Sequence, residues 1–156
     1  LFNEIDKIQL YLKDKKSITN DEIFKLINLS ENHSINDLIN NCLAKKQKRL
    51  FNILNDNIFS YEDCIIIIRT LLKKAKILLN LINQFNLNND IEKTIKNARP
   101  PIFWKEKNIV KDQINLWSVE KIKNLIVETN NIELQIKKNS LNAINFTTNF
   151  LLEKSH

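Results

Sequence analysis

The chain has 156 residues, 43% of them hydrophobic, and its net charge at pH 7 is +6. This length allows one ordinary hydrophobic core, or one domain with part of another. The sequence contains no glycine, which excludes the phosphate-binding loops of P-loop and dinucleotide-binding proteins, because those loops need backbone positions without a Cβ atom. The positive charge would suit a nucleic-acid partner, but abundant Lys, Ile and Asn are also typical of an AT-rich genome.

No stretch of the sequence has the length of a membrane span. The longest apolar block, Ile65–Ile68, is far shorter than the roughly 20 residues that a transmembrane helix needs. There is no signal-peptide pattern, so we expect a cytoplasmic protein. The chain starts at Leu1, within a helical pattern and without Met, and we interpret it as a fragment of a longer protein.

Residues that bind metals or form disulfides are few. Cys42 and Cys64 lie at interior positions of apolar helical patterns, which predicts reduced core thiols in preference to a disulfide or a metal pair. His33 and His156 have no ligand-forming neighbours in the sequence. We therefore expect neither a metal site nor a cofactor.

The first 30 residues predict a pair of helices. Apolar residues at spacings of four, three and four mark the first helix, from Leu1 to Leu12. Thr19 and Glu22 form a capping box, which satisfies backbone N–H groups at the start of a second, short helix. Because that helix is too short to be stable alone, we interpret the pair as the end of a truncated module and Ser30–His33 as a linker.

Two further helices are predicted between Ser34 and Ile58. Ser34 starts the first, whose apolar stripe continues to Leu43. Lys45–Arg49 then forms an exposed turn and the solvated start of the second helix, which includes Leu50. A solvated face is favoured for this basic cluster, and a phosphate contact is the alternative.

The longest predicted element is a central helix from Tyr61 to Phe85. Ser60 and Asp63 form the capping signal at its start. Its first half is apolar nearly all round, which predicts burial on several sides. Cationic side chains occupy its remaining face: Arg69, Lys73, Lys74 and Lys76.

The segment Arg99–Lys105 predicts an abrupt corner between helical layers, and we call it the elbow. It follows a short helix near Asp90–Asn97 and contains both prolines of the chain, Pro100 and Pro101. A proline lacks an N–H donor and disfavours helical geometry in the residue before it. The start of the elbow is therefore expected to be extended.

Two aromatic residues, Phe103 and Trp104, follow the prolines. We predict that they anchor the elbow in the core against the long helix. Single-stranded nucleic-acid binding needs aromatic residues interleaved with basic ones, and Phe103–Lys105 hints at such a platform. For Trp104 and Trp117, core anchoring is favoured over base stacking.

Three helices are predicted after the elbow. The first covers Glu106–Trp117, Ser118 caps the second, and Ser140 caps the last, which carries Leu141 and Ile144 on its apolar face. No strand is predicted. The fold class is therefore all-α, with about seven helices in the larger domain and one long helix at its centre.

The sequence offers no groups that would converge for catalysis. No histidine base accompanies a serine or cysteine nucleophile, and most acidic residues fall at helix starts, where capping explains them. An enzyme of an unrecognised helical class stays open only as a default alternative.

Motifs in a fixed order resemble a known family. They are Asn3-Glu4 with Lys7 and Tyr11, Ile18-Thr19 with Glu22-Ile23, the helix start at Ser34–Ala44, Arg69 and Leu72 on the long helix, Ala98–Lys105, Trp117-Ser118 and Ile136-Lys137. This order resembles the C-terminal part of the delta subunit of the bacterial DNA polymerase III clamp loader, over essentially the whole chain. Its most specific piece is the elbow followed by a helix ending in Trp-Ser, with the signature residues Arg99, Pro100, Pro101, Phe103, Trp104, Lys105 and Trp117.

The resemblance implies two parts, with residues 1–30 as the end of a helical lid module and residues 31–156 as a helical collar domain. In the family, collars of five subunits pack into a ring, and the delta subunit opens the sliding clamp so that it can be loaded on primed DNA during DNA replication. The resemblance therefore implies an accessory subunit of a DNA-directed DNA polymerase, without catalytic residues or a cofactor of its own. The implied partners are the other clamp-loader subunits through the collar, and the sliding clamp and primed DNA through an N-terminal region that is missing here.

One position departs from the family's pattern. The family usually has glycine near the turn after the first collar helix, where this chain has Lys45 and Lys46, so the geometry of that turn stays open. The alternative hypothesis is a free-standing basic helical domain that binds DNA or RNA. It is favoured by the net charge of +6 and by the clusters Lys45–Arg49 and Arg69–Lys76.

Overall fold

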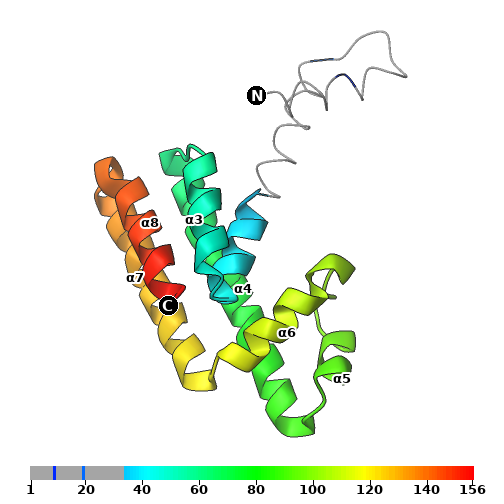
Figure 1. Ribbon diagram of the computed structural model, residues 1–156. Helices are drawn as coiled ribbons and strands as arrows, with labels where there is room; N and C mark the ends of the chain where they lie inside the picture. Colours follow the sequence, from blue (N-terminus) through cyan, green and yellow to red (C-terminus); the bar gives the residue numbers. More distant parts are fainter. Residues whose placement is uncertain (1–8, 10–18, 20–33) are drawn as a thin grey trace. The chain divides into compact units, whose positions relative to one another are not determined.

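The computed structural model describes residues 34–156, together with Gln9 and Thr19. The other predictions for residues 1–33, which are two helices, a linker, the environment of His33 and the lid module, lie outside the described residues. Every regular element in the described part is helical, which confirms the all-α fold class (Figure 1). Residues Asp37–His156 form one compact unit.

Seven α-helices lie in the described part, and none of them combines the length and apolar character that crossing a membrane requires. The first is helical over residues 34–43. The remaining elements, with two 3₁₀ turns, are α3 (Gln47–Asp56), α4 (Tyr61–Asn88), α5 (Ile91–Lys96), η1 (Trp104–Glu106), α6 (Lys107–Leu116), α7 (Val119–Lys138), η2 (Ser140–Asn142) and α8 (Ala143–Lys154).

The long helix α4 is the centre of the unit, and α5, α6, α7 and α8 all pack against it (Figure 1). It starts with the predicted capping box, in which the Asp63 N–H donates to the Ser60 hydroxyl at 3.1 Å and the Ser60 N–H donates to the Asp63 carboxylate at 2.8 Å. It extends beyond the predicted end at Phe85 because Asn89 caps it in the left-handed conformation (φ 50°), which asparagine tolerates. Its buried residues are Cys64, Ile67, Ile68, Leu71, Ala75, Leu78, Leu81 and Ile82.

α7 lies along α4, and α8 packs on both of them (Figure 1). Ser118 caps α7 as predicted, since its hydroxyl accepts a hydrogen bond from the Lys121 N–H at 3.2 Å. Arg69 of α4 pairs with Glu133 of α7 at 3.0 Å, and Lys137 pairs with the same carboxylate at 2.6 Å. These three helices form the main part of the core, with α3 packed on α8 and with α5 and α6 packed on α4.

Four apolar residues that the sequence placed on buried helix faces are exposed. Ile58 lies beyond the end of α3 and is fully exposed, and Ile66 of α4 is 44% exposed, so that helix is not covered on every side. Ser140 does not cap α8: it begins η2, and α8 starts after that turn without a side-chain cap. Because the tighter 3₁₀ turn shifts the predicted stripe out of register with the core, Leu141 and Ile144 are 95% and 49% exposed.

The turn after the helix over residues 34–43 closes without glycine. Lys45 adopts a left-handed conformation with φ 55°. The Lys46 N–H donates to the Asn41 carbonyl at 3.0 Å and the Lys45 N–H donates to the Cys42 carbonyl at 3.1 Å, which is the pattern of a Schellman motif. A lysine thus occupies a backbone position that favours glycine, in a chain that contains no glycine.

Both cysteines are buried and free, as the sequence predicted. Burial raises the pKa of the Cys42 thiol to about 12. Burial also raises the pKa of Cys64, and the carboxylate of Asp63 adds to that effect. Both thiols are therefore held in the neutral form, which suits core packing and disfavours nucleophilic chemistry.

Candidate functional site

The elbow connects α5 to α6 and contains no α-helix (Figure 1). Its Arg99–Pro100 peptide bond is cis, and Pro100 and Pro101 both lie outside helices, as predicted. The turn η1 overlaps its end and leads into α6. The predicted corner is therefore present at the predicted residues.

The aromatic residues of the elbow are not buried, and the prediction that they anchor it in the core is wrong. Phe103 is 55% exposed and Trp104 is 68% exposed. Their ring centroids lie 5.8 Å apart, and the Lys105 ammonium lies 5.3 Å from the centroid of the Trp104 ring. The physical reason is that polar contacts of Glu106, rather than apolar packing, hold the end of the elbow to the helices.

Glu106 is bound by two residues that are distant in the sequence. Its Oε1 atom accepts hydrogen bonds from Asn40 Nδ2 at 2.8 Å and from Lys74 Nζ at 3.2 Å, and Lys74 Nζ also donates to Asn40 Oδ1 at 2.8 Å. The side chain of Gln113 donates to the backbone carbonyl of Asn40 at 3.0 Å. This network, which we call the Glu106 network, joins the helix over residues 34–43 to α4, η1 and α6.

The interior position of the Glu106 network makes it stronger than a surface ion pair. Asn40 and Gln113 are each 4% exposed. The side chain of Lys74 is only 19% exposed to solvent, and that of Glu106 is 30% exposed. Hydrogen bonds to charged groups contribute about 1.5–3 kcal/mol each, more than the median of surface pairs.

Sequence reasoning misses the Glu106 network. The pattern assigns Lys74 to a solvated cationic face and Glu106 to an ordinary helix start. One signal was available, because Asn40 and Asn41 interrupt the apolar run Leu38–Leu43. A buried polar side chain needs a partner, but that signal does not name the partner.

Trp117 is the buried aromatic anchor of this region, as predicted. It is 8% exposed, and its indole Nε1 donates to the backbone carbonyl of Leu43 at 2.7 Å. That carbonyl belongs to the last turn of the helix over residues 34–43, where no intrahelical donor follows. The Lys45 ammonium lies 5.3 Å from the centroid of the Trp117 ring. Of the aromatic signature residues, only Trp117 therefore has a core role.

The surface around the elbow carries a surplus of positive charge. The acidic residues between α5 and α6 are already engaged: Glu92 with Lys111, Glu106 with Lys74, Asp112 with Lys46, and Asp90 with the backbone N–H of Lys93. Within the described part of the chain, five exposed cations here have no acidic partner: Lys93, Lys96, Arg99, Lys105 and Lys107.

The basic cluster Lys45–Arg49 is mostly engaged inside the chain. Lys46 pairs with Asp112 at 3.0 Å, and Arg49 pairs with Asp37 at 3.3 Å. Lys48 is exposed and forms no ion pair with any described residue. The cluster as a whole is therefore a poor phosphate site, and only Lys48 offers its charge to an external partner.

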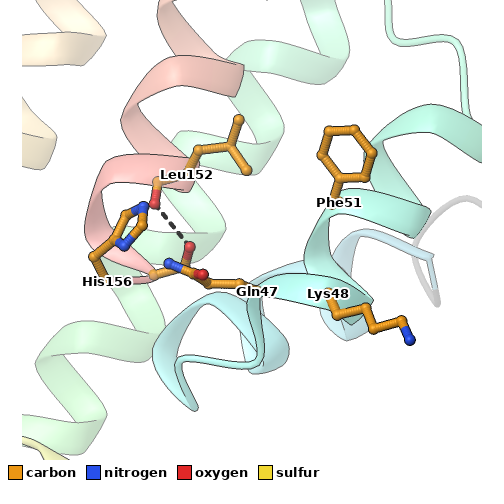
Figure 2. Close-up of a pocket in the computed structure, with 6 residues that line it drawn as sticks. Gln47, Lys48, Phe51, Leu152 and His156 are labelled. Carbon is orange, nitrogen blue, oxygen red and sulfur yellow. Dashed lines mark hydrogen bonds between the residues drawn. The ribbon is translucent and has the colours of Figure 1, made fainter.

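A shallow pocket lies between α3 and α8 near the C-terminal end of α8. Figure 2 shows Phe51 of α3 and Leu152 of α8 on its two sides, with Gln47 below and between them, His156 next to Leu152 and Lys48 directed outwards. The Ser155 hydroxyl also lines it and donates to the Leu152 carbonyl at 2.7 Å. The pocket offers apolar walls and no carboxylate side chain.

The remaining perturbed ionisable groups have structural explanations. The hydrogen bond from Lys137 lowers the pKa of Glu133, burial works against this effect, and Arg69 adds to it. Burial disfavours the charged form of Lys154, but hydrogen bonds and charges of Glu153 and Glu128 outweigh that effect, so its pKa is raised. Among the described residues, no cluster of histidine, cysteine or acidic side chains has the composition of a metal site.

Comparison of the chain with protein-family models, with curated proteins and with solved structures gave no match.

Proposed function

We propose that the chain is a non-catalytic assembly module: the collar, with the end of the lid, of a clamp-loader delta subunit in bacterial DNA replication. The order of motifs through the elbow and Trp117-Ser118 supports this proposal. The observation that carries it is the amount of apolar side-chain surface left uncovered on a basic helical domain. Within residues 34–156, the large exposed apolar residues are Phe51, Ile58, Ile66, Leu87, Phe103, Trp104, Leu116, Val127, Leu134, Leu141 and Ile144.

These exposed residues are distributed in a way that favours assembly over a single ligand site. They lie on α3, α4, α6, α7 and α8 and on the loops between helices, not in one cleft. Scattered exposed apolar residues are normal in soluble proteins, but several on neighbouring helices are typical of surfaces that become buried between subunits. A ring-forming domain uses more than one side in this way.

Reconstitution with the other subunits of a bacterial clamp loader tests the proposal. The chain is mixed with those subunits, without intact delta, and the products are separated by size-exclusion chromatography. We expect the chain to enter a stoichiometric complex, and to bind no ATP by itself. Failure to join any loader complex would refute the collar assignment.

The elbow favours a second candidate function, which is binding of single-stranded nucleic acid by a basic helical domain. An exposed Phe103–Trp104 pair with the Lys105 ammonium against it offers stacking faces, and the unpaired cations near it offer phosphate contacts. Stacking of a base on an aromatic side chain contributes about 1–3 kcal/mol.

Fluorescence anisotropy with a labelled oligonucleotide separates the two candidates. Nucleic-acid binding predicts tight association that weakens steeply with salt and that Trp104→Ala reduces by at least tenfold. The assembly proposal predicts only weak association of the chain alone. Phe51→Ala on α3 serves as the control for removal of an exposed aromatic ring, because Phe51 is 54% exposed and lies outside the elbow.

A further inference from the structure

Helix α3 is the least covered of the longer helices in the described part. Leu50 is its only buried residue. Phe51, the next residue, is 54% exposed, and Ile53 and Leu54 are half-buried. An amphipathic helix is stabilised mainly by the burial of its apolar face. α3 therefore has apolar surface that remains available to a further element.

The uncovered side of α3 continues across to α8. Gln47 and Phe51 are one turn apart on α3, and Leu152 and Ser155 are three positions apart at the end of α8, so each pair lies on one side of its segment. The two helices pack against each other, and Phe51 faces Leu152 across the pocket (Figure 2). Two parallel rows of side chains at helical spacing form a groove of the kind that accepts the side-chain ridge of a third helix.

The charged residues at this groove favour a partner with acidic side chains. None of the residues that line the groove has an acidic side chain, and Lys48 stands at its rim, directed outwards (Figure 2). Lys46 and Arg49, in the same basic cluster, are neutralised by Asp112 and Asp37. Lys48 is the cation of these three that is still available to an acidic side chain outside the chain.

We propose that the groove between α3 and α8 binds an acidic amphipathic helix of a neighbouring subunit. An apolar side chain of that helix enters the pocket between Phe51 and Leu152, and a carboxylate near it pairs with Lys48. This inference rests on the proposed assembly function and adds to it one binding face and the chemistry of its partner. A helix is favoured over an extended strand because the backbone groups of α3 and α8 are already paired within their own helices.

The test uses the reconstituted clamp-loader subunits as the probe. Phe51→Ala removes the apolar wall, and Lys48→Glu reverses the charge at the rim. Each has a control on α7, outside the apolar residues named for assembly: Asn131→Ala, at an exposed position, and Lys123→Glu, at an exposed lysine. Affinity is measured by isothermal titration calorimetry, and thermal melting of each variant verifies that it is folded.

We expect each groove variant to bind at least tenfold more weakly than the unmodified chain and each control to bind within twofold of it. Groove variants that bind like the unmodified chain would overturn the groove inference and leave the assembly proposal intact. Equal losses in the groove variants and the controls would overturn it as well, because the effect would then not belong to this face. If the unmodified chain itself does not join the subunits, the result refutes the proposed function and, with it, the groove inference that rests on it.

Discussion

Replacement of Trp117 separates the core role of one tryptophan from the surface role of the other. Trp117 is 8% exposed and donates its indole N–H to the Leu43 carbonyl, whereas Trp104 is 68% exposed. Both residues belong to the signature residues selected from the sequence. Packing therefore predicts opposite outcomes for the same substitution at two positions of one motif.

The expected magnitudes follow from burial. Trp117→Ala removes a buried aromatic ring and costs about 3–5 kcal/mol of unfolding free energy. Trp117→Phe keeps most of the packing but leaves the carbonyl of Leu43, a residue that is 1% exposed, without this donor, at a cost of about 1–3 kcal/mol. Trp104→Ala exposes little that was buried and changes the stability by less than about 0.5 kcal/mol.

Urea unfolding followed by circular dichroism at 222 nm measures all three variants under the same conditions. For a chain of this size about 1 kcal/mol corresponds to 2–4 °C in melting temperature, so Trp117→Ala melts roughly 10 °C lower. Equal destabilisation by Trp117→Ala and Trp104→Ala would refute the reasoning. Trp117→Phe with unchanged stability would show that the bond to Leu43 contributes nothing net.

Three further predictions concern the backbone, pH and thiols. Lys45→Val is less stable than Lys45→Gly by about 1–2 kcal/mol in chemical denaturation, because both lose the lysine contacts and only valine opposes the left-handed conformation; equal stabilities would contradict this. Glu133→Gln is destabilising at pH 7. Because folding lowers the pKa of Glu133, its contribution to stability is present above the ordinary value of 4.5 and is lost as the pH falls through the lowered pKa, so the melting temperatures of the two proteins converge at acidic pH. Cys42 and Cys64, 0% and 1% exposed, react with a maleimide at pH 8 only at the rate of unfolding, and fast labelling of the folded chain would exclude the buried arrangement.

The sequence predicted best those features that local chemistry determines. Ser60 with Asp63, and Ser118, satisfy backbone groups within four residues of themselves, so their capping roles were readable from spacing. The central helix was predictable from its capping signal and its run of apolar residues, and the corner was predictable because prolines disfavour a helix. Ser140 failed as a cap because the chain forms a 3₁₀ turn there before α8 begins, an outcome that the residue types do not distinguish.

The candidate site was harder to predict, because its contacts join distant parts of the chain. A tryptophan has the same hydrophobicity whether its ring packs inward or outward. The residue type alone therefore does not predict that Trp117 is buried and Trp104 is exposed. Lys74 has three cationic neighbours on its helix, and only the fold shows that it faces Glu106. Periodicity gives the buried face of a helix but not the partner that covers it.

The Glu106 network also determines something about the time course of folding. Asn40 and Glu106 are 66 positions apart in the chain, and Lys74 and Glu106 are 32 positions apart. Bonds across such separations form only after long loops have closed and the intervening helices have docked. Interactions that form after the transition state act mainly on the unfolding rate. We therefore expect loss of the network to shorten the lifetime of the folded elbow, and with it the time that Phe103 and Trp104 stay at the surface, more than it slows folding of the domain.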